Sequence, residues 1–150
     1  MRVVLQRVSE ATVTVNTEIV GSIATGFMIL LGIEQADTEE DIDWLCRKII
    51  AMRVFSDEAG RMNKSLEEIA GELLVISQFT LHASIKKGNR PSFLQAARPE
   101  QAVPLYEKFI RSLELLTNKP LETGIFGADM KVSLVNDGPV TIVIDSKNRE

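Results

Sequence analysis

Hydrophobic and polar residues alternate through the first segment of the chain, Val3–Val15. A period of two is typical of a strand with one buried face. Residues 16–18 (Asn-Thr-Glu) predict a turn, and a second strand is expected to begin at Ile19. The segment Phe27–Leu31 is apolar at every position, which indicates a central strand that is covered on both sides.

Two amphipathic helices are predicted from apolar residues at spacings of three and four. The first helix is expected to begin near Asp37, because Asp37 and Glu40 have the spacing of a capping box. The second is expected to begin near Pro99, with Pro104 in its early part, where a missing backbone N–H costs least. The apolar stripes consist of Ile42, Leu45, Cys46, Ile49 and Ile50 in the first helix and of Ala102, Leu105, Tyr106, Phe109, Ile110 and Leu113 in the second.

Three further strands are predicted in the second half of the chain. One is Leu73–Leu81, and two more occupy residues 130–135 and 140–144, joined by a turn at residues 136–139. Residues 82–98 contain Gly, Pro, Lys and Arg without periodicity, which predicts a long loop of the kind that often carries function. No repeat or linker interrupts these elements. We therefore expect residues 1–150 to form a single layered α/β domain with both helices on one face of a sheet.

Composition is that of an ordinary globular protein, with 150 residues of which 45% are hydrophobic. The net charge of −4 gives no general attraction for nucleic acid, although a few local cations suffice to bind the end of an RNA. Cys46 is the only cysteine, so an intrachain disulfide is excluded and a reducing compartment is expected. With one cysteine and one histidine, His82, we expect neither a metal site nor a cofactor.

The N-terminal segment does not have the composition of a signal peptide, because no cationic stretch precedes a long apolar one. The longest apolar run, Phe27–Ile33, is too short to span a membrane. The expectation is a soluble, cytoplasmic protein with neither a membrane nor DNA as its partner.

Two short segments carry residue types that favour chemistry over packing. Ser77-Gln78-Phe79-Thr80 follows an apolar run, so it brings hydroxyls and an amide to the end of a buried strand. In residues 136–141 (Asn-Asp-Gly-Pro-Val-Thr), the proline removes a backbone donor, and the glycine avoids the clash that restricts other residues before proline. Carbonyl groups of such a segment are left for other partners. Together the two segments predict a polar pocket that is bounded by main-chain atoms.

These two motifs resemble those of the D-aminoacyl-tRNA deacylase family. The resemblance also includes Met1–Val8, Gly88–Phe93 and Thr123–Met130, and it covers essentially the whole chain in order, without a large insertion. It implies a three-layer, barrel-like fold of mixed and antiparallel sheets that works as a homodimer. It further implies hydrolysis of the ester bond that joins a D-amino acid to the acceptor end of tRNA.

The resemblance implies roles for particular residues. The Gly138–Pro139 bond is expected to be cis, with its carbonyls lining the partner subunit's pocket beside Val140 and Thr141. Arg7 is expected to fix this loop, and Met130 to lie near the pocket. Without the resemblance, Gly138-Pro139 would be interpreted as an ordinary turn. Arg7 would be interpreted as solvent-facing and Met130 as a residue that fills the core.

The first motif leaves two interpretations open for Thr80. As a nucleophile it needs a base, and the only candidate is His82, which shares its face if the strand continues; otherwise it is a polar residue at a strand end. Ser77 and Gln78 either orient the ester carbonyl or satisfy backbone groups where the strand frays. The backbone N–H of Phe79 is the expected donor of an oxyanion hole.

Lys86, Lys87 and Arg90 form the only notable cationic cluster, within the predicted loop. They either contact tRNA phosphates near the pocket or belong to an ordinary solvated loop.

The leading hypothesis is an esterase in which main-chain donors stabilise the oxyanion and the 2′-hydroxyl of the substrate ribose assists water. An acyl-enzyme at Thr80 stays open as a second mechanism. Gly138 and Pro139 would exclude an L side chain sterically, so D-amino acids would be accepted broadly and glycyl-tRNA would be a secondary substrate. The alternatives are a non-catalytic module that binds RNA ends or small ligands, and a hydrolase for another ester or amide.

Overall fold

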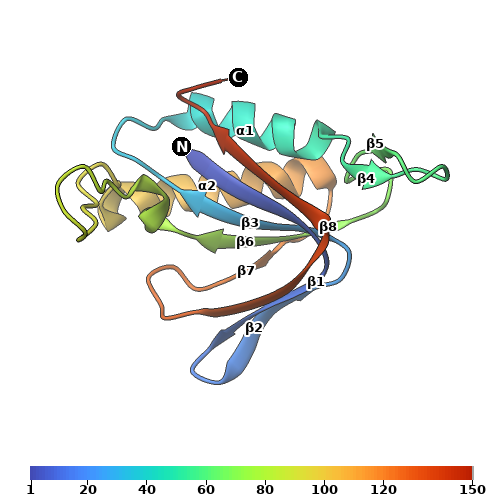
Figure 1. Cartoon of the computed structure of the whole chain (residues 1–150), viewed down its shortest axis with the longest axis horizontal. Coiled ribbons are helices and arrows are strands. Elements are labelled where there is room, and N and C mark those ends of the chain that lie inside the picture. Colours follow the sequence, from blue (N-terminus) through green and yellow to red (C-terminus); the bar gives the residue numbers. More distant parts are fainter. Residues whose placement is uncertain (150) are drawn as a thin grey trace.

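The computed structural model describes residues 1–149. Figure 1 shows both α-helices on one side of a strongly curved sheet, and the Ser146 N–H donates to the Met1 carbonyl at the start of the chain. The elements in chain order are β1 (Arg2–Val15), β2 (Glu18–Ile23), β3 (Gly26–Gly32), α1 (Glu39–Ala51), β4 (Phe55–Ser56), β5 (Met62–Lys64), β6 (Glu72–Ser77), the 3₁₀ helix η1 (Phe79–His82), α2 (Pro99–Thr117), β7 (Glu122–Thr123) and β8 (Lys131–Asp145).

Strand β1 organises the sheet. One of its edges pairs antiparallel with β3 along Arg2–Val8 and with β2 along Ala11–Val15, while the other edge pairs with β8 along Arg2–Thr14. Strands β3, β6 and β7 then pair in parallel. The sheet bends so far that β2 returns towards β7, where the Ser22 N–H donates to the Glu122 carboxylate at 3.3 Å. The nearly closed, barrel-like sheet with two helices confirms the predicted fold class.

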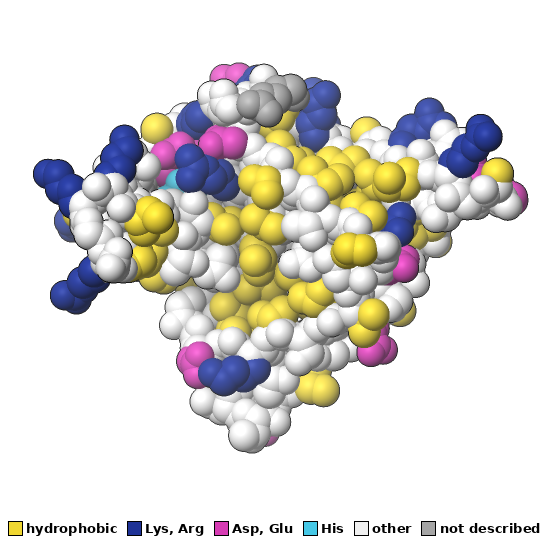
Figure 2. All heavy atoms as spheres, in the orientation of Figure 1, with side chains coloured by type: hydrophobic (Ala, Val, Ile, Leu, Met, Phe, Trp, Pro, Cys, Tyr) yellow, Lys and Arg dark blue, Asp and Glu magenta, His cyan; other side chains and the backbone are white. Residues whose placement is uncertain are grey.

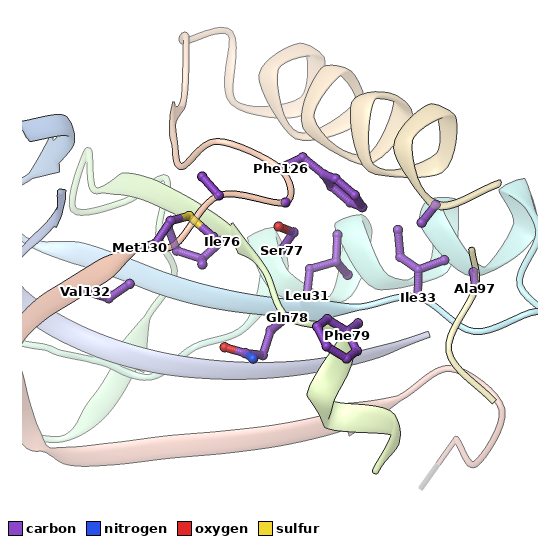
Figure 3. A pocket seen from close by; sticks show the side chains of 13 residues that line it. Leu31, Ile33, Ile76, Ser77, Gln78, Phe79, Ala97, Phe126, Met130 and Val132 are labelled. Carbon is purple, nitrogen blue, oxygen red and sulfur yellow. The ribbon is translucent and has the colours of Figure 1, made fainter. Parts of the chain in front are cut away.

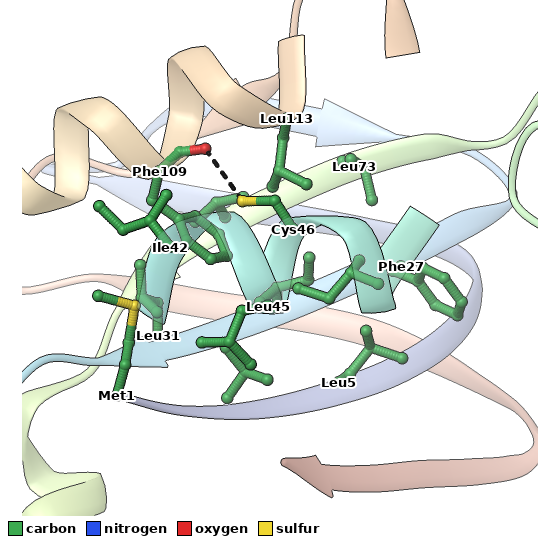
Figure 4. Packing of buried hydrophobic residues seen from close by; sticks show 14 of the residues in the cluster. Met1, Leu5, Phe27, Leu31, Ile42, Leu45, Cys46, Leu73, Phe109 and Leu113 are labelled. Carbon is green, nitrogen blue, oxygen red and sulfur yellow. Dashed lines mark hydrogen bonds between the residues drawn. The ribbon is translucent and has the colours of Figure 1, made fainter. Parts of the chain in front are cut away.

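Two hydrophobic clusters fill the molecule. The larger lies between the helices and the sheet, where Phe27, Leu45 and Phe109 are fully buried (Figure 4). The Cys46 thiol in α1 donates to the Phe109 carbonyl of α2 at 3.8 Å, and burial raises its pKa to about 12, so it stays protonated and unreactive. The smaller cluster lies inside the curved sheet and contains Val8, Ala11, Val13, Ile23, Met28, Leu74 and Ile76.

Two predicted strand boundaries are wrong, each for a non-local reason. The strand predicted as Leu73–Leu81 ends at Ser77, because its parallel partner β3 ends at Gly32 and no ladder partner follows. The two strands predicted around residues 136–139 are one continuous strand, β8, because β1 pairs with it on both sides of the Gly-Pro segment.

Helix α1 begins one residue later than predicted. Its N-cap is Thr38, and Asp41 completes the capping box, accepting the Thr38 N–H at 2.8 Å. Asp37 does not cap the helix, because its carboxylate accepts hydrogen bonds from the Met1 amino group and from the Glu34 N–H. Within residues 1–149, no helix is long and apolar enough to cross a membrane.

Asp41 also joins α1 to the end of β8. The Ser146 hydroxyl donates to one carboxylate oxygen of Asp41 at 2.7 Å, and the Lys147 ammonium donates to the other at 2.7 Å. Burial on its own raises the pKa of Asp41. The hydrogen bonds from Lys147, Ser146 and Thr38 outweigh burial, so the pKa of Asp41 lies well below its ordinary value.

A lowered pKa in the folded state means that ionised Asp41 stabilises the fold above about pH 4 and that this contribution disappears as the pH falls further. We therefore expect Asp41→Asn to lower the free energy of unfolding more at pH 6 than at pH 3, as measured by urea unfolding. Asp43→Asn, at an exposed position of the same helix, is the control. An equal effect of Asp41→Asn at both pH values would contradict this assignment.

Candidate active site

A cavity of about 270 Å³ opens where β6 ends, between the start of η1 and the segment that leads into β8 (Figure 3). Three residues of the first motif, Ser77, Gln78 and Phe79, line it together with Met130. Most of the remaining lining is apolar, so a bound group would be largely removed from water. These other residues are Leu31, Ile33, Ile76, Ala97, Ala102, Phe126, Gly127, Ala128 and Val132.

The chain turns sharply out of β6 into η1, and backbone donors at this turn are left without acceptors among the described residues. The Gln78 N–H donates to the Leu31 carbonyl at 2.7 Å, which is the last contact with β3. The next two N–H groups, those of Phe79 and Thr80, have no acceptor among the described residues, because the first donors of a helical turn lack an intrahelical partner. Phe79, whose N–H was predicted as an oxyanion donor, lines the cavity, and this N–H has no acceptor among the described residues.

Among residues 1–149, no side chain that could act as a base forms a hydrogen bond with Thr80. Its side chain is exposed, and its hydroxyl accepts a hydrogen bond from the Gln78 amide. His82 is buried, and neither of its ring nitrogens has a hydrogen-bond partner within residues 1–149. The Glu34 carboxylate lies 3.9 Å from its Nδ1. Since η1 replaces the predicted strand, the two side chains do not share a strand face, and a serine-protease-like triad at Thr80 is not formed.

Gly32 is a site residue that the pattern of the sequence did not reveal. A Cβ atom at this position would lie 3.0 Å from the Gln78 carbonyl oxygen and 3.0 Å from the Leu81 Cβ. Glycine therefore lets η1 pack directly on the end of β3. A glycine that ends a fully apolar strand is the only signal for this role in the sequence.

The second motif forms a bulge in β8, which we call the Gly-Pro bulge (residues 137–140). Strand β1 pairs Gln6 with Thr141 and Val8 with Asn136, so four residues of β8 stand opposite Arg7 alone. The Gly138–Pro139 bond is cis, and both residues are exposed. The bulge does not line the cavity of its own chain.

Arg7 holds the first half of this bulge. Its Nε donates to the Asp137 carbonyl at 3.0 Å, and its Nη1 donates to the Val54 carbonyl at 2.6 Å. The Asp137 carboxylate lies 3.5 Å from the same Nε. The side chain is only 9% exposed, so Arg7 is not the solvent-facing residue that its strand pattern alone suggested. Its two carbonyl acceptors come from segments far apart in the sequence, which no local pattern reveals.

The remaining predicted residues lie around these two places. Met130 is half-buried at the cavity, whereas Val140 and Thr141 belong to the bulge and the strand just after it. The Phe79 ring meets Phe93 edge to face, with centroids 5.1 Å apart, at the base of the loop over residues 83–98. The cationic residues Lys86, Lys87 and Arg90 are all exposed in that loop.

A family model described as D-Tyr-tRNA(Tyr) deacylase matches residues 4–145. The chain belongs to this family. The D-aminoacyl-tRNA deacylases of Flavobacterium johnsoniae and of Bacteroides thetaiotaomicron are each 61% identical to it over 150 residues, which is 100% of this chain and of each relative. Membership confirms the family predicted from the two motifs, together with the prediction of a hydrolase.

Two solved structures are similar to the whole chain. One, described as "c-Myc DNA Unwinding Element Binding Protein", has a TM-score of 0.90 at 41% identity and covers 97% of this chain and 98% of its own. The other, described as "a probable eukaryotic D-amino acid tRNA deacylase", has a TM-score of 0.80 at 18% identity, with 95% and 97% covered. The second similarity supports the fold alone.

Gly138 has a φ of +127°, and a Cβ atom there would lie 2.8 Å from the Arg7 Nη2 and 2.9 Å from the Val140 Cγ2. We expect Gly138→Ala to lower the free energy of unfolding by about 3 kcal/mol, because backbone strain and a steric clash add. Gly88→Ala is a matched control, since Gly88 also has a positive φ (+76°) but nothing within 4 Å, and we expect a loss of only about 1–2 kcal/mol. Equal losses in urea unfolding would contradict the close packing of Gly138 against Arg7.

Proposed function

We propose that this chain hydrolyses the ester bond of D-aminoacyl-tRNA and releases the free D-amino acid and tRNA, as the names of its relatives indicate for them. The observation that carries the proposal is that Phe79, whose N–H is unpaired among the described residues, lines a mostly apolar cavity. The family makes the substrate an aminoacyl ester, whose carbonyl oxygen gains negative charge when water attacks. A fixed donor at that oxygen stabilises the transition state.

In the proposed reaction, water attacks the ester carbonyl carbon and forms a tetrahedral oxyanion that accepts the Phe79 N–H. The C–O bond to the terminal ribose then breaks, the ribose oxygen takes one proton of the water, and the amino acid leaves as a carboxylate while the other proton passes to solvent. One well-placed donor of this kind is typically worth about 10²–10³ in rate. Gln78 holds Thr80 through its amide and so shapes the polar edge of the cavity.

We assign the transfer of the proton from the attacking water to a group of the substrate. Among the described residues no carboxylate or imidazole reaches Thr80, whose hydroxyl accepts from Gln78. The vicinal 2′-hydroxyl of the terminal ribose lies next to the ester in every aminoacyl-tRNA. It is therefore the nearest group that can orient water and pass its proton to the leaving oxygen.

We propose that a second copy of the chain discriminates between D- and L-aminoacyl substrates. The Gly-Pro bulge is exposed and lies outside the cavity of its own subunit, so its carbonyls are available to a partner. Hydrophobic side chains gather in the middle of the face shown in Figure 2, with lysine and arginine towards its periphery. On β8, Val143 is 69% exposed and Val135 is 49% exposed. Such a surface supports burial against a second subunit.

The cationic loop is proposed to contact the acceptor end of the tRNA. Lys86, Lys87 and Arg90 are exposed, and the loop is tied to the cavity wall by the contact between Phe79 and Phe93. Cations placed there would meet phosphates of a substrate whose terminal ester enters the cavity. This local charge compensates for the negative charge of the chain as a whole.

The deciding experiment compares release of the amino acid from D-tyrosyl-tRNA, L-tyrosyl-tRNA and glycyl-tRNA under identical conditions. If carbonyls of the bulge stand where an L side chain would lie, D-tyrosyl-tRNA is cleaved at least about 100-fold faster than the L form, which corresponds to about 2.7 kcal/mol. Glycyl-tRNA should be cleaved, because it has no side chain to exclude. Comparable cleavage of the L form would rule out the proposed exclusion, and binding without release would favour a binding module.

Thr80→Ala is expected to lower kcat by no more than about tenfold, because the variant loses a neutral hydrogen bond and no nucleophile. A substrate with a 2′-deoxy terminal ribose should react at least about 100-fold more slowly with the unchanged enzyme, since the assisting hydroxyl is gone. Both rates are measured as single turnovers, with circular dichroism as the check on folding. Near-complete loss of turnover in a folded Thr80→Ala variant would favour the acyl-enzyme instead.

A further inference from the structure

We infer that Asn136 is a positioning residue that sets the direction of the Pro139 carbonyl and thereby the discrimination between D and L substrates. The inference rests on the proposed function, in which carbonyls of the Gly-Pro bulge exclude the L side chain. In this inference, Asn136 and its hydrogen-bond partner Gln6 hold the part of the bulge that Arg7 does not contact.

The Gly-Pro bulge needs restraints of its own. Between the paired positions Gln6–Thr141 and Val8–Asn136, the four residues of the bulge face a single residue of β1 and have no regular ladder. Arg7 holds only the first half, through the Asp137 carbonyl at 3.0 Å. The second half, where the Pro139 carbonyl lies, must be held by other groups.

Asn136 uses both ends of its amide to close the second half of the bulge. Its Oδ1 accepts the Val140 N–H at 3.1 Å. Its Nδ2 donates to the Gln6 Oε1 at 3.0 Å and to the Thr141 Oγ1 at 3.0 Å. A rotation of the amide by 180° would set its NH₂ against the Val140 N–H, so the two acceptors fix which way the amide faces.

The bond to the Val140 N–H determines where the preceding carbonyl points. The N–H of Val140 and the C=O of Pro139 belong to one planar peptide unit, which is trans, so the two groups point in opposite directions. Because Asn136 holds the N–H on its own side, the Pro139 oxygen is directed away from Asn136. Arg7 therefore fixes the Asp137 carbonyl in the first half of the bulge, and Asn136 fixes the Pro139 carbonyl in the second half.

Loss of this restraint should change selectivity more than it changes folding. The ladder between β1 and β8 continues on both sides of the bulge, from Arg2 to Gln6 and from Val8 to Thr14. The fold therefore has many contacts that do not involve the Asn136 side chain. A freed Pro139–Val140 peptide could rotate and withdraw its oxygen from the path of an L side chain.

The test measures kcat/KM for D- and L-tyrosyl-tRNA with the full-length chain and with Asn136→Ala. We expect the D/L ratio to fall about tenfold, chiefly through faster cleavage of the L form, which is the effect of losing a hydrogen bond that acts only on discrimination. Ser133→Ala, at an exposed position of the same strand, is the matched control and should leave the ratio unchanged. A purely structural defect would lower both rates together.

Two more variants keep the inference open to refutation. Asn136→Asp retains an acceptor for the Val140 N–H and should keep the ratio within about threefold of the unchanged chain. Gln6→Met removes the acceptor that orients Asn136 without touching the bulge, and it should lower the ratio by at least about threefold. Should Asn136→Ala fail to fold, Gln6→Met decides the matter.

The outcomes separate this inference from the proposed function. An unchanged D/L ratio in folded Asn136→Ala or in Gln6→Met, with clear discrimination by the unchanged chain, would overturn the role of Asn136 alone. An Asn136→Asp variant as unselective as Asn136→Ala would do the same. Absence of discrimination in the unchanged chain would remove the proposed function, and this inference with it.

Discussion

The pairing of β1 on both of its edges is the constraint on which the rest of the structure depends. One edge carries β3 and then β2, and the other carries β8 along almost the whole strand. This arrangement curls the sheet and gives β6 its place beside β3. It also holds both flanks of the Gly-Pro bulge in register. The cavity and the bulge are thus two products of one set of backbone hydrogen bonds.

Local patterns predicted the long elements, missed the short strands β4, β5 and β7, and placed the ends of elements poorly. The alternation of β1 and the stripes of α1 and α2 reflect burial, which repeats with the period of each element and is visible in the sequence. The end of β6 depends on the length of β3, and the continuity of β8 depends on β1. The capping box was misplaced by one residue because Asp37 and Thr38 offer similar local signals, and the hydrogen bonds of Asp37 with the Met1 amino group and the Glu34 N–H form only in the folded chain.

In the candidate site, too, features with a local signal were predicted, and features that depend on distant residues were not. The two motifs were visible because hydroxyl, amide, glycine and proline residues are unusual at strand ends. The contacts of Arg7 with the Val54 and Asp137 carbonyls were not visible, because they join segments that meet only after folding. Asn136 stood within the second motif, yet its partner Gln6 lies 130 positions away. Resemblance to the family predicted the hydrolase, whereas the contacts that hold the bulge became visible only in the structure.

The bulge also restricts how the chain can change in length. Between the pairs Leu5–Ile142 and Ala11–Leu134, eight steps along β8 accompany six steps along β1, so β8 holds two extra residues across the bulge. Side chains of a strand face alternate sides, so the parity of that excess decides which side chains of β8 point inward on either flank. A single-residue insertion or deletion would exchange the inner and outer faces of one flank. Homologues that preserve this fold should therefore vary in length here only by even numbers.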